Sequence, residues 1–215
     1  MSIFYRFQDS GLDDWDIANN YMQMGFRPGF GIQARELTQM QTILQGQITA
    51  LAKRFLVSGS VIDAELQFCP SGGSLWSGSL KQGYIYIEPA QKQLGYFVYN
   101  NSQLNFSSIE TDPTQQTNVY VVYEEVQVNP DGNPYPAGGG YARVTVDGLL
   151  KDNAQGYSNY SAPGGSRYQI NILTGGSYVV GSGGLPTNGV NIAYYDPSQA
   201  VWKYIDSDDT VQVCG

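Results

Sequence analysis

No charged residue lies between Glu36 and Lys53, although the apolar side chains of this segment recur at helical spacing. They step along the chain by 3, 4, 4, 3 and 4 residues, at Leu37, Met40, Leu44, Ile48, Leu51 and Phe55. This period predicts an amphipathic helix of about 23 residues with one apolar stripe. Such a stripe needs an apolar surface to cover it, so the rest of the fold or a partner must supply one.

The other face of the predicted helix is polar but uncharged. It carries Thr38, Gln39, Gln41, Thr42, Gln45, Gln47 and Thr49. Helix faces in contact with water usually carry Glu, Lys and Arg, whereas amides and hydroxyls suit a surface that forms hydrogen bonds with protein neighbours. We therefore predict an interchain helix with these partner-binding residues: Arg27, Arg35, Leu37, Met40, Gln41, Leu44, Gln45, Ile48 and Leu51.

Three charged residues mark the entry to this helix: Arg27, Arg35 and Glu36. A carboxylate at Glu36 is favourable near the positive end of the helix dipole, while Arg35 is unfavourable there without an acidic neighbour. Two interpretations have equal weight. One is local capping with a surface ion pair, and the other is an interchain clamp on the acidic segment 13–16.

Several short motifs of this region carry a resemblance. They are Arg27-Pro-Gly, Gln33-Ala-Arg-Glu-Leu-Thr-Gln-Met-Gln, Leu44-Gln and Gly59-Ser-Val. In residues 20–63 the chain resembles a family of tailed-bacteriophage structural proteins found in baseplates and tail-fibre attachments. The resemblance implies a virion tail component that has no catalytic role. It also implies other tail, baseplate or fibre proteins and further copies of the chain as partners. Because the first residues show no signal peptide, we expect synthesis in the host cytoplasm.

The composition fits a protein that is permanently packed among partners in an assembly better than a free enzyme. Charged residues make up 14% of the 215 residues, against about 25% in an average domain, while Gly numbers 26 and Tyr 17. The net charge of −8 argues against nucleic-acid binding, which needs a basic patch. No apolar run approaches the roughly 20 residues that span a bilayer, so we expect no membrane partner.

After the helix, the pattern changes to alternation with a period of two and to strands rich in β-branched and aromatic residues. The expected strands are 61–68, 84–88, 95–99, 119–128, 141–146, 168–173, 177–180, 190–195 and 201–205. A Gly-Gly hairpin is expected between the last residues of 168–173 and the start of 177–180. We therefore predict a mainly β, α+β protein in which an N-terminal extended arm and long amphipathic helix precede an antiparallel sandwich or small barrel.

Three segments follow from this pattern: an arm and docking helix over 1–57, a first β module over 58–110, and a second β module over 111–215. Cys69 and Cys214 can pair only if the C-terminus returns to the first β segment. Free buried thiols are favoured, because disulfides are rare in proteins made in the cytosol.

Catalytic and metal-binding patterns are weak. The chain has no histidine, which removes Ser-His and Cys-His catalysis and the usual zinc sites, so we expect no enzyme, cofactor or metal. Carboxylates that a glycosidase would need have no spacing that singles out a pair: Glu65, Glu88, Asp112, Glu124, Glu125, Asp147 and Asp196. The alternative function is a carbohydrate-binding module, in which aromatic residues such as Trp76, Tyr157, Tyr160 and Trp202 contact a host glycan.

Overall fold

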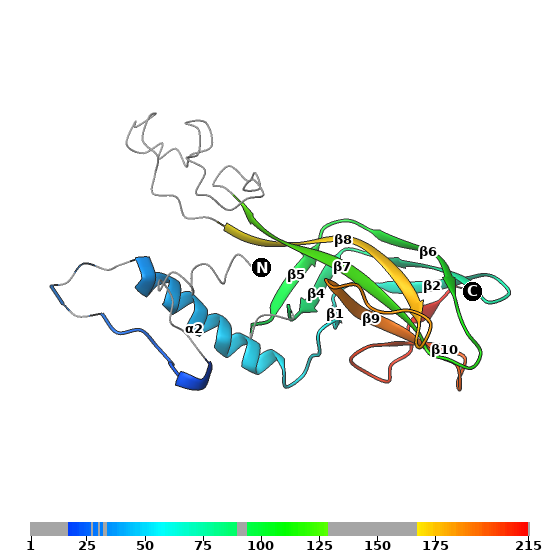
Figure 1. The fold of residues 1–215 in the computed structure, drawn as a ribbon, viewed down its shortest axis with the longest axis horizontal. Coiled ribbons are helices and arrows are strands. Elements are labelled where there is room, and N and C mark those ends of the chain that lie inside the picture. The colour runs from blue at the N-terminus through cyan, green and yellow to red at the C-terminus, as the bar shows by residue number, and fades with distance from the viewer. Residues whose placement is uncertain are drawn as a thin grey trace, which may run out of the picture.

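The computed structural model describes residues 17–26, 28–29, 31, 34–89, 94–128 and 167–214 (Figure 1). The helical elements are the 3-10 turn η1 (Ile17–Asn19) and the helix α2 (Ala34–Ala52). The strands are β1 (Val61–Ile62), β2 (Leu66–Gly72), β3 (Leu75–Leu80), β4 (Gly83–Ile87), β5 (Tyr96–Asn100), β6 (Leu104–Glu110), β7 (Thr117–Val128), β8 (Arg167–Val179), β9 (Gly189–Asp196), β10 (Val201–Tyr204) and β11 (Gln212–Val213). The expected mainly β class is confirmed.

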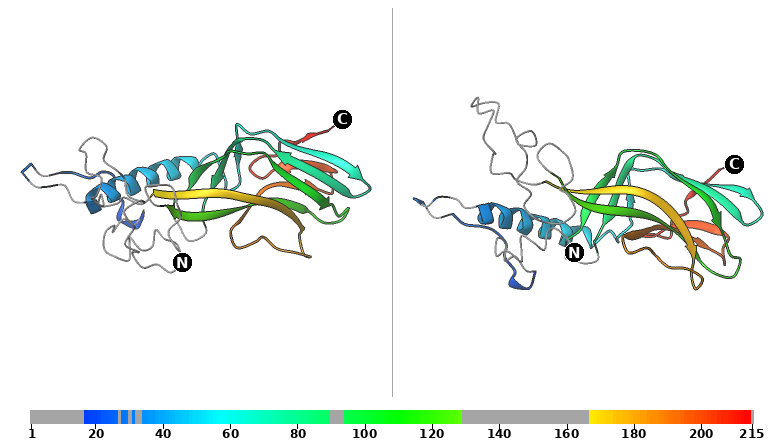
Figure 2. Two further views of the ribbon diagram at one scale, coloured as in Figure 1. Left: turned by 90° about the horizontal axis from the view of Figure 1, so that it is seen from above. Right: turned by 45° about the horizontal axis from the view of Figure 1, so that its top comes forward.

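The strands form three sheets. Their orders are β1-β4-β5, β10-β9-β7-β8 and β11-β2-β3-β6. All pairings between these strands are antiparallel except that of β11 with β2, which is parallel. The two four-stranded sheets lie in facing layers, and α2 extends from the end of the body where β4 and β5 lie (Figures 1 and 2).

One hydrophobic core lies between these sheets. Its centre is aromatic, because the ring of Phe68 on β2 stacks on that of Trp202 on β10 at a centroid distance of 4.1 Å. Trp76 meets Trp202 edge-on at 5.9 Å. Branched aliphatic side chains from all three sheets complete the core, among them Ile85, Ile109 and Ile192. Side chains alternate between the two faces of a strand, so the inward-facing residues of packed sheets share one interior.

The predicted boundary between two β modules falls between β6 and β7. The core, however, draws on both stretches, since Phe68 and Ile109 pack in the same cluster as Val119 and Trp202. Strand β11, at the C-terminal end of the chain, also joins the sheet of β2. The described residues of 58–110 and of 111–215 thus contribute to one interior.

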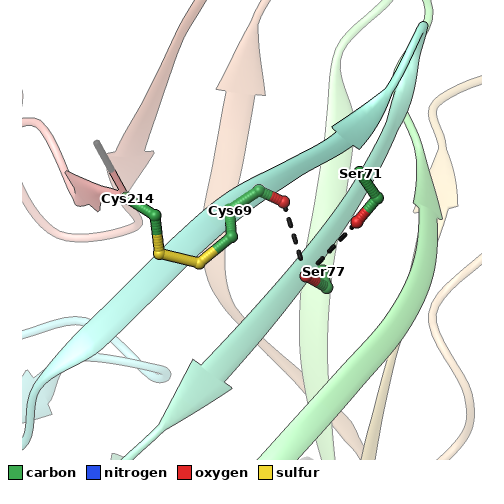
Figure 3. The surroundings of a disulfide bond; sticks show 4 residues. All are labelled: Cys69, Ser71, Ser77 and Cys214. Carbon is green, nitrogen blue, oxygen red and sulfur yellow. Dashed lines mark hydrogen bonds between the residues drawn. A yellow bond between two sulfur atoms is a disulfide. The ribbon is translucent and has the colours of Figure 1, made fainter.

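Figure 3 shows that Cys69 and Cys214 form a disulfide. The expectation of free thiols was wrong, because the condition for pairing is met: β11 runs beside β2 and brings the Cα atoms within 4.8 Å. The N–H of Cys214 also donates to the carbonyl of Phe68 at 2.9 Å. The disulfide therefore fastens the C-terminal strand to the first long strand of the body.

The expected Gly-Gly hairpin was also wrong, because β8 continues through Gly175 and Gly176. A side chain at Gly175 would collide with the ring of Phe106, and one at Gly176 with the ring of Tyr120. These glycines leave room for aromatic rings over the sheet, which is the other common reason for glycine inside a strand.

Gly59, which belongs to the motifs that carry the resemblance, joins the helical region to the body. Its φ is +107°, a conformation that side chains rarely adopt. A Cβ there would also collide with the carbonyl oxygen of Asn191 on β9. The N–H of Gly59 donates to the carbonyl of Tyr86 at 2.8 Å, so this turn sits between β4 and β9.

Some expected features lie outside the described residues. They are the arm over residues 1–16, including the acidic segment 13–16, and the strand 141–146.

Candidate functional site

Helix α2 rests on the body through its hydroxyl-bearing face. Thr42, Ile43, Thr49 and Ala52 are buried along this side. Ile43 packs in a small cluster with Leu94, and the partly buried ring of Tyr96 covers both. The face predicted to meet neighbouring chains is therefore partly occupied by the chain's own β5 region.

The helix is attached at Gly95, just before β5, where the side chains of Thr49 and Gln45 meet the backbone of Gly95. Thr49, which is 2% exposed, accepts a hydrogen bond from the N–H of Gly95 at 2.9 Å. Its hydroxyl in turn donates to the carbonyl of Gln45 at 2.8 Å. The amide of Gln45 donates to the carbonyl of Gly95. The amide of Gln45 is thus engaged within the chain, and its interchain contact stays a prediction.

Gly95 has no space for a side chain at this point. A Cβ would collide with the phenol ring of Tyr86, which lies under the attachment. Burial and the nearby Glu88 carboxylate raise the pKa of Tyr86, so the phenol stays neutral. An ion pair of Lys53 with Glu88, at 2.9 Å, holds the C-terminal end of the helical region beside β4.

The apolar stripe of α2 faces the opposite way and is exposed. We use this name for Leu37, Met40, Leu44, Ile48, Leu51 and Phe55. Their exposure ranges from 39% at Ile48 to 78% at Phe55. Phe55 lies in the turn just after the helix, which ends at Ala52 after 19 residues, fewer than the sequence suggested.

The size of the apolar stripe is unusual for a free monomer. Its side chains expose on the order of 600 Å², the upper end of the largest apolar patch on typical monomers. Apolar surface of this extent commonly marks a site where another protein binds. No described residue of the chain covers it.

The partner-binding role of the other predicted residues stays a prediction. Gln41 is exposed beside the apolar stripe. Arg35 lies in the first turn of α2, but its side chain is outside the described part, as is the whole of Arg27. The proposed clamp on residues 13–16 therefore stays a prediction.

Sequence reasoning missed one segment beside α2. Met22 lies next to the helix, because the amide of Gln47 donates to its carbonyl at 3.0 Å. The side chains of Met22 and Phe26 are exposed. The only signal was the short run Tyr21-Met-Gln-Met24, which has no helical or strand period.

The carboxylates considered for glycoside hydrolysis that the structure describes have structural partners, while Asp147 lies outside the described residues. Glu65 pairs with Lys81 at 2.7 Å, and Glu124 accepts from Asn171 at 3.2 Å. Asp112 caps a turn, and the hydroxyl and N–H of Thr114 lower its pKa. A carboxyl that acts as general acid needs the opposite shift.

Asp196 is held in a similar way at the end of β9. The Ser198 hydroxyl, with help from Lys203 at 3.2 Å, lowers its pKa. Because the folded pKa lies below the usual value, this interaction stabilises the fold above the usual pKa. It is lost as pH falls through the folded value.

The aromatic residues suggested for glycan contact are mostly placed elsewhere. Trp202 is 1% exposed and belongs to the core, and Trp76 packs against it. Tyr157 and Tyr160 lie outside the described residues. Exposed rings do occur on β4 and β5, at Tyr84, Phe97 and Tyr99. Tyr84 and Tyr99 face each other across the strands with centroids 5.1 Å apart.

Two further observations concern the described part of the chain. Its acidic and cysteine side chains form no group of three that could hold a metal ion. Its helices are too short or too polar to cross a membrane. Comparison of the chain with protein-family models, curated proteins and solved structures found no match.

Proposed function

We propose that the chain is a structural component of a phage tail, either a baseplate wedge part or a tail-fibre attachment protein, and that it acts by protein–protein assembly. The observation that carries this proposal is the apolar stripe, which is exposed on a helix whose other face is attached to the body. Of the motifs that resemble phage tail proteins, Leu44-Gln and most of the motif that begins at Gln33 lie on the same helix, Arg27-Pro-Gly precedes it, and Gly59 follows it.

The attachment of α2 explains how such a part would work mechanically. Hydrogen bonds at Gly95 and the Lys53–Glu88 ion pair fix the direction of the helix relative to the sheets. The apolar stripe is thus presented without a need to order the helix on binding. Preorganisation of this kind lowers the entropic cost of association.

A density map of the intact virion of the phage that encodes this chain would test the proposal. We expect the chain in the tail, with the apolar stripe covered by protein. Absence of the chain from the virion, or a stripe that faces solvent there, would contradict the proposal.

The second candidate, a carbohydrate-binding module, is favoured by the exposed rings of Tyr84, Phe97 and Tyr99. Exposed amide groups lie at the same end of these strands, where Gln82 donates to the carbonyl of Asn101 at 2.8 Å. Aromatic faces bordered by amides offer both apolar contact and hydrogen bonds to a sugar.

A glycan array probed with the full chain would test this candidate. If it is correct, Tyr84→Ala with Tyr99→Ala removes binding that Tyr21→Ala, an exposed tyrosine near α2, retains. An array with no signal, or binding that survives the double substitution, would exclude these rings as a glycan site.

A further inference from the structure

The apolar stripe is accessible along its whole length. The side of α2 that packs on the body is nearly opposite to it, since Thr42 and Thr49 are buried while Leu44, Ile48 and Leu51 are exposed. The N-terminal part of α2 also extends beyond the sheets (Figure 2). A second helix can therefore lie along the apolar stripe without meeting the body of its own chain.

The spacing of the apolar stripe suits a helical partner. Leu37 and Ile48 are related by an 11-residue repeat, as are Leu44 and Phe55. Such a repeat corresponds to about 3.7 residues per turn, close to the period of a straight helix. The apolar stripe therefore runs nearly parallel to the helix axis, and a second helix can contact it from end to end.

The lack of charged residues on α2 indicates a partner whose contacting surface is also uncharged. The chain carries 30 charged residues, 19 acidic and 11 basic, yet none of them lies from Leu37 to Ala52. Gln41 and Gln47 border the apolar stripe where charged residues usually select a partner of opposite charge. A matching surface must be an apolar strip with neutral polar borders.

Within the part of the chain that the structure describes, α2 itself presents a surface with these properties. We infer that the apolar stripe binds the same stripe of further copies of this chain, so that their α2 helices form a bundle. This inference rests on the proposed function, because it names the partner at the same site. A pair of stripes would bury on the order of 1,200 Å², which reaches the lower limit for specific, stable interfaces.

Mass measurement and cross-linking of the purified full chain test this inference. Light scattering should give the mass of two or more copies. With the native disulfide intact, a short bis-maleimide should link copies of Leu44→Cys or Ile48→Cys through the new thiol. Ala50→Cys is the matched control, since Ala50 is exposed on α2 but lies off the apolar stripe. It should give at least tenfold less linked product.

A chain with the mass of one copy at every concentration reached would overturn the inference. So would self-association in which Ala50→Cys cross-links and the two stripe variants do not, because another surface would then be responsible. If the purified chain has the mass of one copy, the proposed function still holds when the virion map shows another protein on the apolar stripe. A stripe facing solvent in the virion overturns both.

Discussion

Replacement of Cys69 and Cys214 by serine is expected to lower the free energy of unfolding by up to about 5 kcal/mol, since the crosslink closes a loop with a sequence separation of 145 residues. A crosslink across so long a loop removes much conformational freedom from the unfolded chain. For a chain of this size the loss corresponds to a fall in Tm of about 10–20 °C.

Part of the C-terminal attachment should survive without the disulfide. Val211 is buried in the core, and its N–H donates to the carbonyl of Trp202 at 2.8 Å. The variant should therefore still fold, with a cooperative transition at lower temperature. Thermal or urea unfolding of the oxidised protein, the reduced protein and the double variant measures the effect.

The reduced protein and the serine variant should agree, and a reductant should leave the variant unchanged. If reduction of the native protein leaves its unfolding transition where it was, the disulfide does not hold the C-terminal strand in the way described.

The strands that the sequence predicted best are those whose own residues favour them. Segments such as Tyr84-Ile-Tyr-Ile87 and Val190-Asn-Ile-Ala-Tyr-Tyr195 are rich in β-branched and aromatic residues, and both form strands. Local composition is enough to predict such strands, because β-branched and aromatic side chains fit a half-buried, pleated surface.

The strands β3 and β6 escaped prediction because neighbours, not composition, determine them. β3 contains Leu-Trp-Ser-Gly-Ser-Leu, and β6 contains Leu-Asn-Phe-Ser-Ser-Ile-Glu. Each has few strand-forming residues, yet β3 is paired on both sides, by β2 and by β6. Gly78 within β3 lies directly against the ring of Phe68, so glycine serves close packing there.

Long-range pairing was equally invisible in the sequence. The return of β11 to β2, and with it the disulfide, depends on how all the sheets are arranged. The helix illustrates the same limit. Its pattern identified an apolar stripe and a hydroxyl and amide face, but only the position of Gly95 shows that Thr49 and Gln45 bind within the chain.

The second large effect concerns assembly. Leu44→Glu combined with Leu51→Glu places two carboxylates on a stripe that we propose is buried between proteins. An unpaired carboxylate at a buried contact costs several kcal/mol. Each 1.4 kcal/mol weakens association about tenfold, so the pair of substitutions should reduce assembly at least 100-fold.

The fold of the isolated variant should be unaffected, because both side chains are exposed in the single chain, Leu44 at 58% and Leu51 at 65%. Ala50→Glu is the matched control, with a carboxylate on the same helix away from the apolar stripe. Its melting curve and that of the double variant should resemble the native one.

The decisive measurement of the proposed tail role is the amount of each variant in purified particles of the phage that we propose encodes the chain, counted per particle by quantitative mass spectrometry after the gene is replaced. The account predicts that the native chain and Ala50→Glu are incorporated equally, while Leu44→Glu with Leu51→Glu is lost from the particles although it remains folded. Incorporation of the double variant at the native level would show that the apolar stripe of α2 does not hold the protein in its assembly.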